Sequence, residues 1–241
     1  MSTVSVSEKV EKFVASLGIP EGSQSAAYDQ LLELDFPTTR DEYWKYTRTG
    51  KISNSKFQIS KEVRLASIDS IKELIICDNY LIIENGVYRE ELSKVGNASI
   101  EWVSAQETED FSEEVRLNQT DIFNKINDTY TSNILKISGN EAVQLVQIDT
   151  AAGCLINNRI QVRVAKSSEL KIIQTFSGEG TNNLVNNIAQ FHVEENAQCE
   201  INLLQNFSES TSAISTTEVY QEQNSTFRIN TATVSGLLIR N

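Results

Sequence analysis

The sequence predicts a mixed fold, with an α/β N-terminal domain followed by a right-handed parallel β-helix, that is, a β-solenoid. Three observations lead to this fold class. Apolar residues recur at helical spacing near the start of the chain. From about residue 130 onward they alternate with polar residues instead. The later strands also repeat at a nearly constant interval, which is typical of stacked coils. We expect the N-terminal domain to cover residues 1–128 and the solenoid to cover residues 129–241.

Two helices are expected at the start of the chain. Gly18 and Pro20 mark the end of the first helix, because neither residue favours a helix interior. Its apolar face comprises Val6, Val10, Phe13, Val14 and Leu17. The second helix has its apolar face at Ala26, Ala27, Leu31 and Leu34. Both helices therefore present one side to a core.

Two hairpins are expected in the next part of the chain. In ELIICDNYLII (73–83), two apolar runs flank Asp78-Asn79, which reads as a turn. In ENGVYREEL (84–92), Asn85-Gly86 is the dipeptide that tight hairpin turns prefer. We therefore expect a few strands packed against the helices.

The repeats lie in the second half of the chain. VAKSSELKI begins at Val164, VEENAQCEIN at Val193 and VYQEQNSTFRIN at Val219, and each joins two strands through a polar turn. Ile172, Ile201 and Ile229 occupy equivalent places, 29 and 28 residues apart. A strand-turn-strand unit with this period predicts stacked coils with the three isoleucines in vertical register and facing inward.

An antiparallel β-sandwich is the alternative, since it also has short alternating strands joined by frequent turns. Only two prolines occur in the chain, both before residue 40, so neither fold is interrupted. The asparagines of this half fit either ordinary turns or stacked asparagine ladders. They include Asn157, Asn158, Asn182, Asn183, Asn186 and Asn187.

The composition limits the binding partners and the cellular location that we expect. A net charge of −12 disfavours binding to nucleic acid or to an anionic membrane surface. Acidic runs at 8–11, 107–114 and 194–200 are expected to be solvated faces. Residues 1–12 lack the apolar stretch of a signal peptide, and no run is long enough to span a membrane. Three widely spaced cysteines argue against a disulfide framework, so we expect a cytoplasmic protein.

The sequence offers no catalytic, cofactor-binding or metal-binding set of residues. Gly50-Lys51 lacks the first glycine of a phosphate loop. His192 is the only histidine, and we expect it to point away from the face of Phe191 and Val193. The cysteines Cys77, Cys154 and Cys199 have no metal-ligand spacing, and we interpret the latter two as buried apolar residues. Glu194 and Glu195 are adjacent on a strand, so they cannot flank one bond as a glycosidase pair does.

The segment FPTTRDEYWKYT (36–47) is dense in aromatic residues. Thr39 and Glu42 have the spacing of a capping box and predict a short helix after Pro37. We expect Tyr43, Trp44, Tyr46 and Thr47 to be buried by this helix, as a structural anchor.

This segment resembles the P-x-x-R-x-E-x-W-K-Y-T signature near the start of SufD-type proteins, in the SufB/SufD family of iron–sulfur cluster assembly. The matching residues are Pro37, Arg40, Glu42, Trp44, Lys45, Tyr46 and Thr47. LIIENGVYREELSKV (81–95), IFNKINDTY (122–130) and GLLIRN (236–241) resemble further family segments in the same order. Together these segments span almost the whole chain.

The resemblance implies a parallel β-helix core and a non-catalytic partner of SufB in a complex with the ATPase SufC. That complex assembles a nascent cluster and passes it to apoproteins. SufB-like and SufC-like proteins are therefore the expected partners, and the cluster is handled transiently by the full complex. We expect no cofactor on this chain alone, because in the family the second half of the core, the SufC-contacting helices and a late Cys/His stretch follow the LLIRN segment.

A core truncated in this way exposes a strand edge, so we also expect self-association through it. Two other functions stay open from the residues alone. One is a carbohydrate-active β-helix enzyme, and the other is a β-solenoid interaction module without a role in iron–sulfur assembly.

Overall fold

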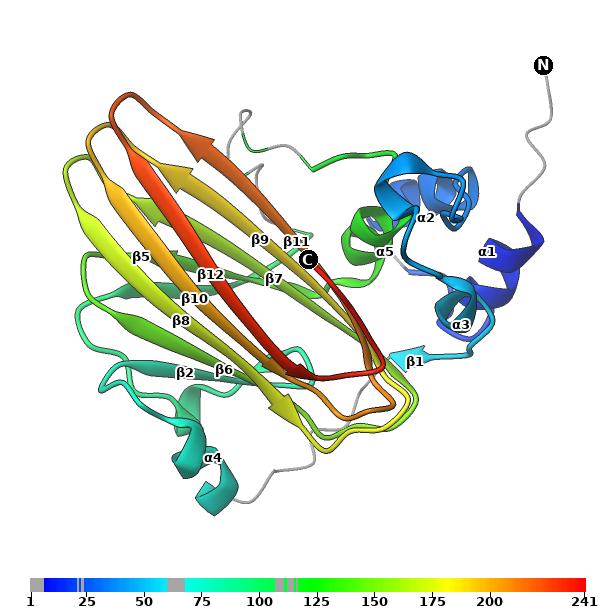
Figure 1. Ribbon diagram of the computed structural model, residues 1–241, viewed down its shortest axis with the longest axis horizontal. Helices are drawn as coiled ribbons and strands as arrows, with labels where there is room; N and C mark the ends of the chain where they lie inside the picture. Colours follow the sequence, from blue (N-terminus) through cyan, green and yellow to red (C-terminus); the bar gives the residue numbers. More distant parts are fainter. Residues whose placement is uncertain are drawn as a thin grey trace.

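The computed structural model describes residues 7–20, 22, 24–59, 68–106, 111, 115 and 117–241. Two β-sheets face each other, and most helices gather beside one of them (Figure 1). Sheet A has the strand order β13-β11-β9-β7-β5-β4, with β1 attached to β7. Sheet B has the order β12-β10-β8-β6-β2-β3. From β5 onward, odd-numbered strands belong to sheet A and even-numbered strands to sheet B, so the chain winds alternately through both.

The winding part is a parallel β-solenoid, as predicted. Neighbouring strands from β5 to β13 pair in parallel in both sheets. The alternative of an antiparallel sandwich is therefore wrong. The strands are β5 (Asn133–Ser138), β6 (Val143–Asp149), β7 (Cys154–Val164), β8 (Glu169–Gly178), β9 (Leu184–Val193), β10 (Gln198–Asn206), β11 (Ser212–Gln221), β12 (Thr226–Ser235) and β13 (Leu238–Arg240).

The predicted isoleucine column is present. Ile201 lies opposite Ile172 on one side and Ile229 on the other, in parallel pairs. Ile172 and Ile201 are buried between the sheets, whereas Ile229 is 44% exposed. The difference arises because Ile229 lies on the last strand of sheet B, where no further coil covers it. Each coil's apolar side chains are thus buried by the coil that stacks on it.

The polar turns of the three repeats share one backbone conformation. Ser167, Asn196 and Asn224 have φ values of +59°, +58° and +59°. Asparagine tolerates this left-handed region better than most residues, because its short polar side chain bonds locally. The backbone N–H of Ser167 donates to the carbonyl oxygen of Glu195 on the next turn, at 3.0 Å. The repeat in the sequence therefore encodes the corner of each coil.

Strands that precede the repeats join the same two sheets. They are β1 (Gln58–Ile59), β2 (Tyr80–Glu84), β3 (Val87–Tyr88) and β4 (Ser99–Ser104). Strand β2 pairs in parallel with β6, and β4 pairs antiparallel with β5. The boundary at residues 128/129 stays a prediction, and the first coil is completed by strands from 80–104.

The hairpin expected around Asp78-Asn79 is wrong: the chain bends at residues 77–79, but residues 73–77 form no strand. Residues before it end helix α4 (Ile68–Leu74), which packs Ile71 against the outer face of sheet B. The side-chain Oε1 of Gln144 accepts hydrogen bonds from the backbone N–H groups of Ile76 (2.8 Å) and Cys77 (3.3 Å). A distant glutamine therefore satisfies the amides that a hairpin partner would have satisfied.

The turn expected at Asn85-Gly86 is confirmed. It connects β2 to β3 in an antiparallel pair, with φ of +49° at Asn85 and +81° at Gly86. A Cβ atom at Gly86 would lie 2.8 Å from the carbonyl oxygen of Asn157. Both the backbone conformation and the close approach of β7 therefore require glycine here.

The helices form a second core on the outer face of sheet A. Buried apolar residues from α1 (Glu8–Val14), α2 (Gln24–Leu32), α3 (Gly50–Ser53) and α5 (Ile122–Tyr130) pack with Leu155, Leu184 and Ile214. The two predicted N-terminal helices are confirmed, with Val10, Phe13, Val14 and Leu31 buried. Val6 lies outside the described residues.

Helix α5 is fixed to sheet A by side-chain amides. Asp121 caps it by accepting from the backbone N–H of Phe123 at 2.8 Å. The amide of Asn127 donates to the carbonyl oxygens of Asn158 (3.2 Å) and Asn186 (3.0 Å). Asn157 and Asn158 on β7 lie in register with Asn186 and Asn187 on β9, but no side-chain hydrogen bond joins these pairs, since the amide of Asn186 donates to the carbonyl oxygen of Phe123 instead. The next strand, β11, carries Ile214 and Ser215 at these positions, so the stack of asparagines ends there.

Candidate functional site

The segment 36–47 contains a single 3₁₀ turn, η1 (Glu42–Trp44), instead of the short capped α-helix expected from Thr39 and Glu42. The Oδ2 atom of Asp41 accepts hydrogen bonds from the backbone N–H of Thr38 (2.6 Å) and from its hydroxyl (3.1 Å). These hydrogen bonds lower the pKa of Asp41. The prediction of a capping box is wrong because Thr38 and Asp41 close the turn before a longer helix forms.

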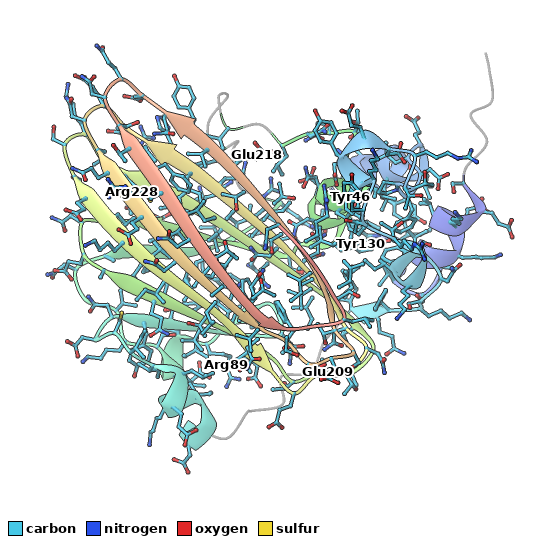
Figure 2. All side chains as sticks on the ribbon, viewed as in Figure 1. Tyr46, Arg89, Tyr130, Glu209, Glu218 and Arg228 are labelled. Carbon is cyan, nitrogen blue, oxygen red and sulfur yellow. The ribbon has the colours of Figure 1, made fainter. Side chains whose placement is uncertain are left out.

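Of Tyr43, Trp44 and Tyr46, only Trp44 is a buried anchor, and it joins the buried Phe36 at the start of the segment. Trp44 is 7% exposed, but Tyr43 and Tyr46 are 87% and 91% exposed. The prediction that all three would be buried is therefore wrong for the tyrosines. Figure 2 shows Tyr46 among the side chains of the helical region beside sheet A. The 3₁₀ turn directs Trp44 inward and leaves both tyrosine rings on the surface.

Trp44 lies between the helical core and the end of the solenoid. Its ring stacks on Phe123 of α5, with centroids 5.1 Å apart and planes at 27°. The guanidinium carbon of Arg240, on β13, lies 4.0 Å from the centre of the same ring. Arg240 also donates from Nη2 to the carbonyl oxygen of Tyr43 at 2.7 Å. Two segments that resemble the family at opposite ends of the chain therefore meet at one cation–π contact.

The coil end next to this contact has unpaired edges. Among the described strands, β12 pairs only with β10, and β13 covers only Ser212, Ala213 and Ile214 of β11. The large apolar residues Ile229, Val234 and Leu237 of this end are 44%, 69% and 40% exposed. Free backbone groups beside exposed apolar side chains form a surface to which another chain can add a strand.

Asp149 is the one buried carboxyl inside the solenoid whose pKa is shifted. Its Oδ2 accepts from Nδ2 of Asn183 at 3.2 Å and from Thr211, and its Oδ1 has no hydrogen-bond partner among the described residues. Burial raises its pKa, and these hydrogen bonds lower it by less. The cavity beside it, also lined by Asn158, holds about 10 Å³, enough for one water molecule. Since no substrate fits there, we interpret Asp149 as structural.

The raised pKa of Asp149 leads to a pH-dependence of stability. A carboxyl whose pKa is higher in the folded state stabilises the fold fully below its unfolded pKa, about 4. That contribution is lost as pH rises from there through the folded pKa. We expect the native chain to lose unfolding free energy relative to Asp149→Asn as the pH rises over this range. Urea denaturation at a series of pH values measures it, and parallel curves for the two proteins would contradict the burial effect.

His192, which is buried, and the acidic run 194–200 are both engaged in polar contacts. As expected, His192 points away from the buried Phe191 and Val193: its Nε2 lies 2.8 Å from Oε1 of Glu222 and its ring packs edge-on against Tyr220. Glu194 and Glu195 pair with Arg163 (2.7 Å) and Lys166 (2.5 Å), so the run 194–200 is not simply a solvated face. The run 107–114 lies outside the described residues except for Phe111.

The cysteines are free thiols. Cys154 and Cys199 are buried, as expected, and burial raises the pKa of Cys199 to about 12, so this thiol stays protonated at neutral pH. Burial, followed by the charge of Asp78, also raises the pKa of Cys77. Within the described ranges, no three His, Cys, Asp or Glu side chains come close enough to hold a metal ion.

Residues 146–241 match a family model described as "SUF system FeS cluster assembly, SufBD core domain". The chain carries a SufBD core domain. This match covers β7 to β13 and most of β6, so the SufBD core domain coincides with the stacked coils, including the Ile172–Ile201–Ile229 column and Arg240. A search of curated proteins found no relative that matches the chain. No helix in the described part of the chain has the length and apolar character needed to cross a membrane.

The sequence did not reveal two parts of this arrangement. It contained no signal that Arg240 would cover Trp44, because the two residues are brought together only by the stacked coils. Asp149 could have been noticed as an acidic residue at the end of an apolar strand, but its burial depends on Asn183 and Thr211 of the following coils. The first feature joins the N-terminal helical region to the stacked coils, and the second lies within the SufBD core domain.

Proposed function

We propose that the chain is a SufD-like, non-catalytic component of a SufBCD-type scaffold for iron–sulfur cluster assembly. The observation that carries the proposal is the SufBD core domain over residues 146–241. The likeness of segment 37–47 to SufD-type proteins favours SufD over SufB. The contact between Trp44 of this segment and Arg240 of the core shows that the two segments pack together in this chain, which supports reading them as parts of one arrangement. We further propose a cytoplasmic location.

We propose SufB-like and SufC-like proteins as partners, with the SufB-like protein covering the open edge of β12. Strand addition there would satisfy the free backbone groups and bury Ile229. In the absence of such a partner the same edge favours self-association of the 241-residue chain. We also propose that the chain alone binds no cluster and hydrolyses no ATP, so the cluster is cargo of the whole complex.

A carbohydrate-active enzyme is a weaker proposal. Such an enzyme needs carboxylates that are free to act on one glycosidic bond. Glu194 and Glu195 are engaged by Arg163 and Lys166 instead. An interaction module without a role in iron–sulfur assembly is the remaining alternative, and the partner experiment separates it from the scaffold.

Co-expression with SufB-like and SufC-like proteins, followed by affinity purification and light scattering, tests the scaffold proposal. We expect a stable complex, and we expect the chain alone to form concentration-dependent oligomers. Ile229→Asn should weaken the complex about tenfold by removing an apolar anchor of the open coil, roughly 1.4 kcal/mol. Arg228→Asn, one position away on the same strand and on the opposite face, is the matched control.

The proposal would be abandoned if no complex forms with either protein, or if Arg228→Asn weakens it as much as Ile229→Asn does. Anaerobic incubation of the isolated chain with iron and sulfide tests the proposal that the chain alone binds no cluster. We expect no stoichiometric visible absorbance band on the monomeric chain, and a stable cluster there would contradict it.

A further inference from the structure

A second surface lies at the other end of the solenoid, where the first coil begins. A cavity of about 670 Å³ opens between β3 of sheet B and β4 of sheet A. Its lining residues are Tyr88, Glu90, Glu91, Val95, Ala98, Ile100 and Trp102. This volume is in the range of sites that bind small molecules or single large side chains. The cavity is separate from the open edge of β12, because β3 and β4 end the two sheets on the opposite side.

The cavity is lined by two rigidly held aromatic rings. Tyr88 and Trp102 lie 5.9 Å apart between centroids, with their planes at 52°. Each ring is partly buried and packs on the solenoid core, together with Ile100. Tyr88 lies opposite the buried Ile83 on β2, and Trp102 lies opposite the buried Leu135 on β5. The rings are therefore fixed by the core beneath them, and their other surfaces border the cavity.

The charges around these rings favour a cation. Glu90 and Glu91 line the cavity from η2 (Glu90–Leu92), and Arg89 is held by Glu84 at 2.6 Å and by Glu91 at 2.5 Å. Arg89, labelled in Figure 2, lies away from the helical region that carries Tyr46. Since Arg89 is already neutralised, the carboxylate of Glu90 adds uncompensated negative charge. It forms no side-chain hydrogen bond or ion pair with the described residues.

The electrostatics of Tyr88 are consistent with this charge distribution. Burial raises the pKa of its phenol, a hydrogen bond with Ser93 lowers it by less, and the charges of Glu90 and Glu91 add smaller effects that raise it. The two carboxylates therefore lie within electrostatic range of the Tyr88 side chain, and all three residues line the same cavity. A cation placed there would interact favourably with both the carboxylates and the aromatic faces.

We propose that this cavity binds an arginine side chain from a basic segment of a protein partner. A planar guanidinium stacks on aromatic faces and pairs with carboxylates, whereas the rings leave too few oxygen ligands for a metal ion. The same molecule already holds a guanidinium in this manner, with Arg240 at 4.0 Å from the ring centre of Trp44. The net charge of −12 also attracts a basic partner. This inference does not rest on the proposed scaffold function.

Titration with acetyl-Gly-Arg-Gly-Arg-Gly-amide tests the site. The Trp44→Phe chain leaves Trp102 as its only tryptophan, so its emission reports on the cavity. Calorimetry on the unmodified chain measures the same binding without that substitution. We expect saturable binding that weakens as salt is added. The peptide with citrulline in place of arginine has nearly the same shape without the charge, and it should not bind.

Variants then separate local contacts from overall charge. Glu90→Gln and Tyr88→Leu should each weaken binding about three- to tenfold, the effect of losing one carboxylate or one aromatic face. Glu101→Gln carries the same charge change beside Trp102, but Glu101 lines a different pocket, together with Lys136 and Arg163. It should leave binding unchanged. Thermal melts of each variant confirm that it is folded.

Four results would overturn the proposal. Equal binding of the citrulline peptide would show that the cavity does not select a cation. Equal weakening by Glu101→Gln and Glu90→Gln would show only a general charge effect. A Trp102 emission that shifts with protein concentration in the absence of peptide would show that a second copy of the chain occupies the cavity. Absence of binding at millimolar peptide would also refute it.

Discussion

Replacing Trp44 with alanine should lower the unfolding free energy by about 3–5 kcal/mol, the usual cost of removing a large buried ring. The expected loss is large because Trp44 packs on Phe123 of α5 on one face and on Arg240 of β13 on the other. The substitution therefore leaves a cavity in the helical core and also frees the last strand. Urea denaturation followed by circular dichroism measures the change.

The neighbouring tyrosines provide matched controls. Tyr43→Ala and Tyr46→Ala remove rings from the same segment, but both side chains are almost fully exposed. Each should change stability by less than about 0.5 kcal/mol, as surface substitutions usually do. If Trp44→Ala were as stable as these controls, Trp44 would have to be a partner contact instead of a structural anchor.

Replacing Gly178 with alanine should destabilise the solenoid by about 2–4 kcal/mol, as severe overpacking does. Gly178 ends β8 and lies in register with Asp149 on β6. A Cβ atom there would overlap both the carboxylate and the backbone carbonyl of Asp149. A side chain can rotate away, but a backbone carbonyl in a parallel pair can move only if the two strands separate.

Gly50→Ala is the control for this substitution. Gly50 begins α3, and a Cβ atom there would meet no atom within 4 Å. The variant should be as stable as the native chain or slightly more stable, because alanine restricts the unfolded chain. Thermal melts of the two variants should differ clearly, and similar melting temperatures would mean that β6 and β8 tolerate the extra methyl group.

The solenoid was predictable because its signals are local and repeated. The two-residue alternation of Ile160, Val162 and Val164 shows which side faces the core, and Ile172, Ile201 and Ile229 set the interval between coils. Each coil meets its neighbour in the same way, so one correct register determines the next. The turn residues Asn196 and Asn224 mark the same interval, because both have the left-handed backbone conformation of a coil corner.

The errors occurred where distant residues decide local structure. Residues 73–77 read as a strand, but the side chain of Gln144 binds the amides of Ile76 and Cys77 and leaves no need for a hairpin. Tyr43 and Tyr46 read as core residues, but Arg240 completes the surroundings of Trp44 without them. The cavity lined by Tyr88 and Trp102 was also not predictable, since it requires β3 and β4 to end opposite sheets.

The contact between Arg240 and the Trp44 segment also determines an order of folding. The hydrogen bond from Arg240 to Tyr43 joins residues 197 positions apart. Closing so long a loop is slow unless intermediate structure shortens it. Coils can stack one after another as the chain leaves the ribosome, but the face of Trp44 opposite Phe123 is covered only once the strand that carries Arg240 is made. Until that strand is made, one face of Trp44 is uncovered, so a ribosome stalled before residue 240 would present it to chaperones.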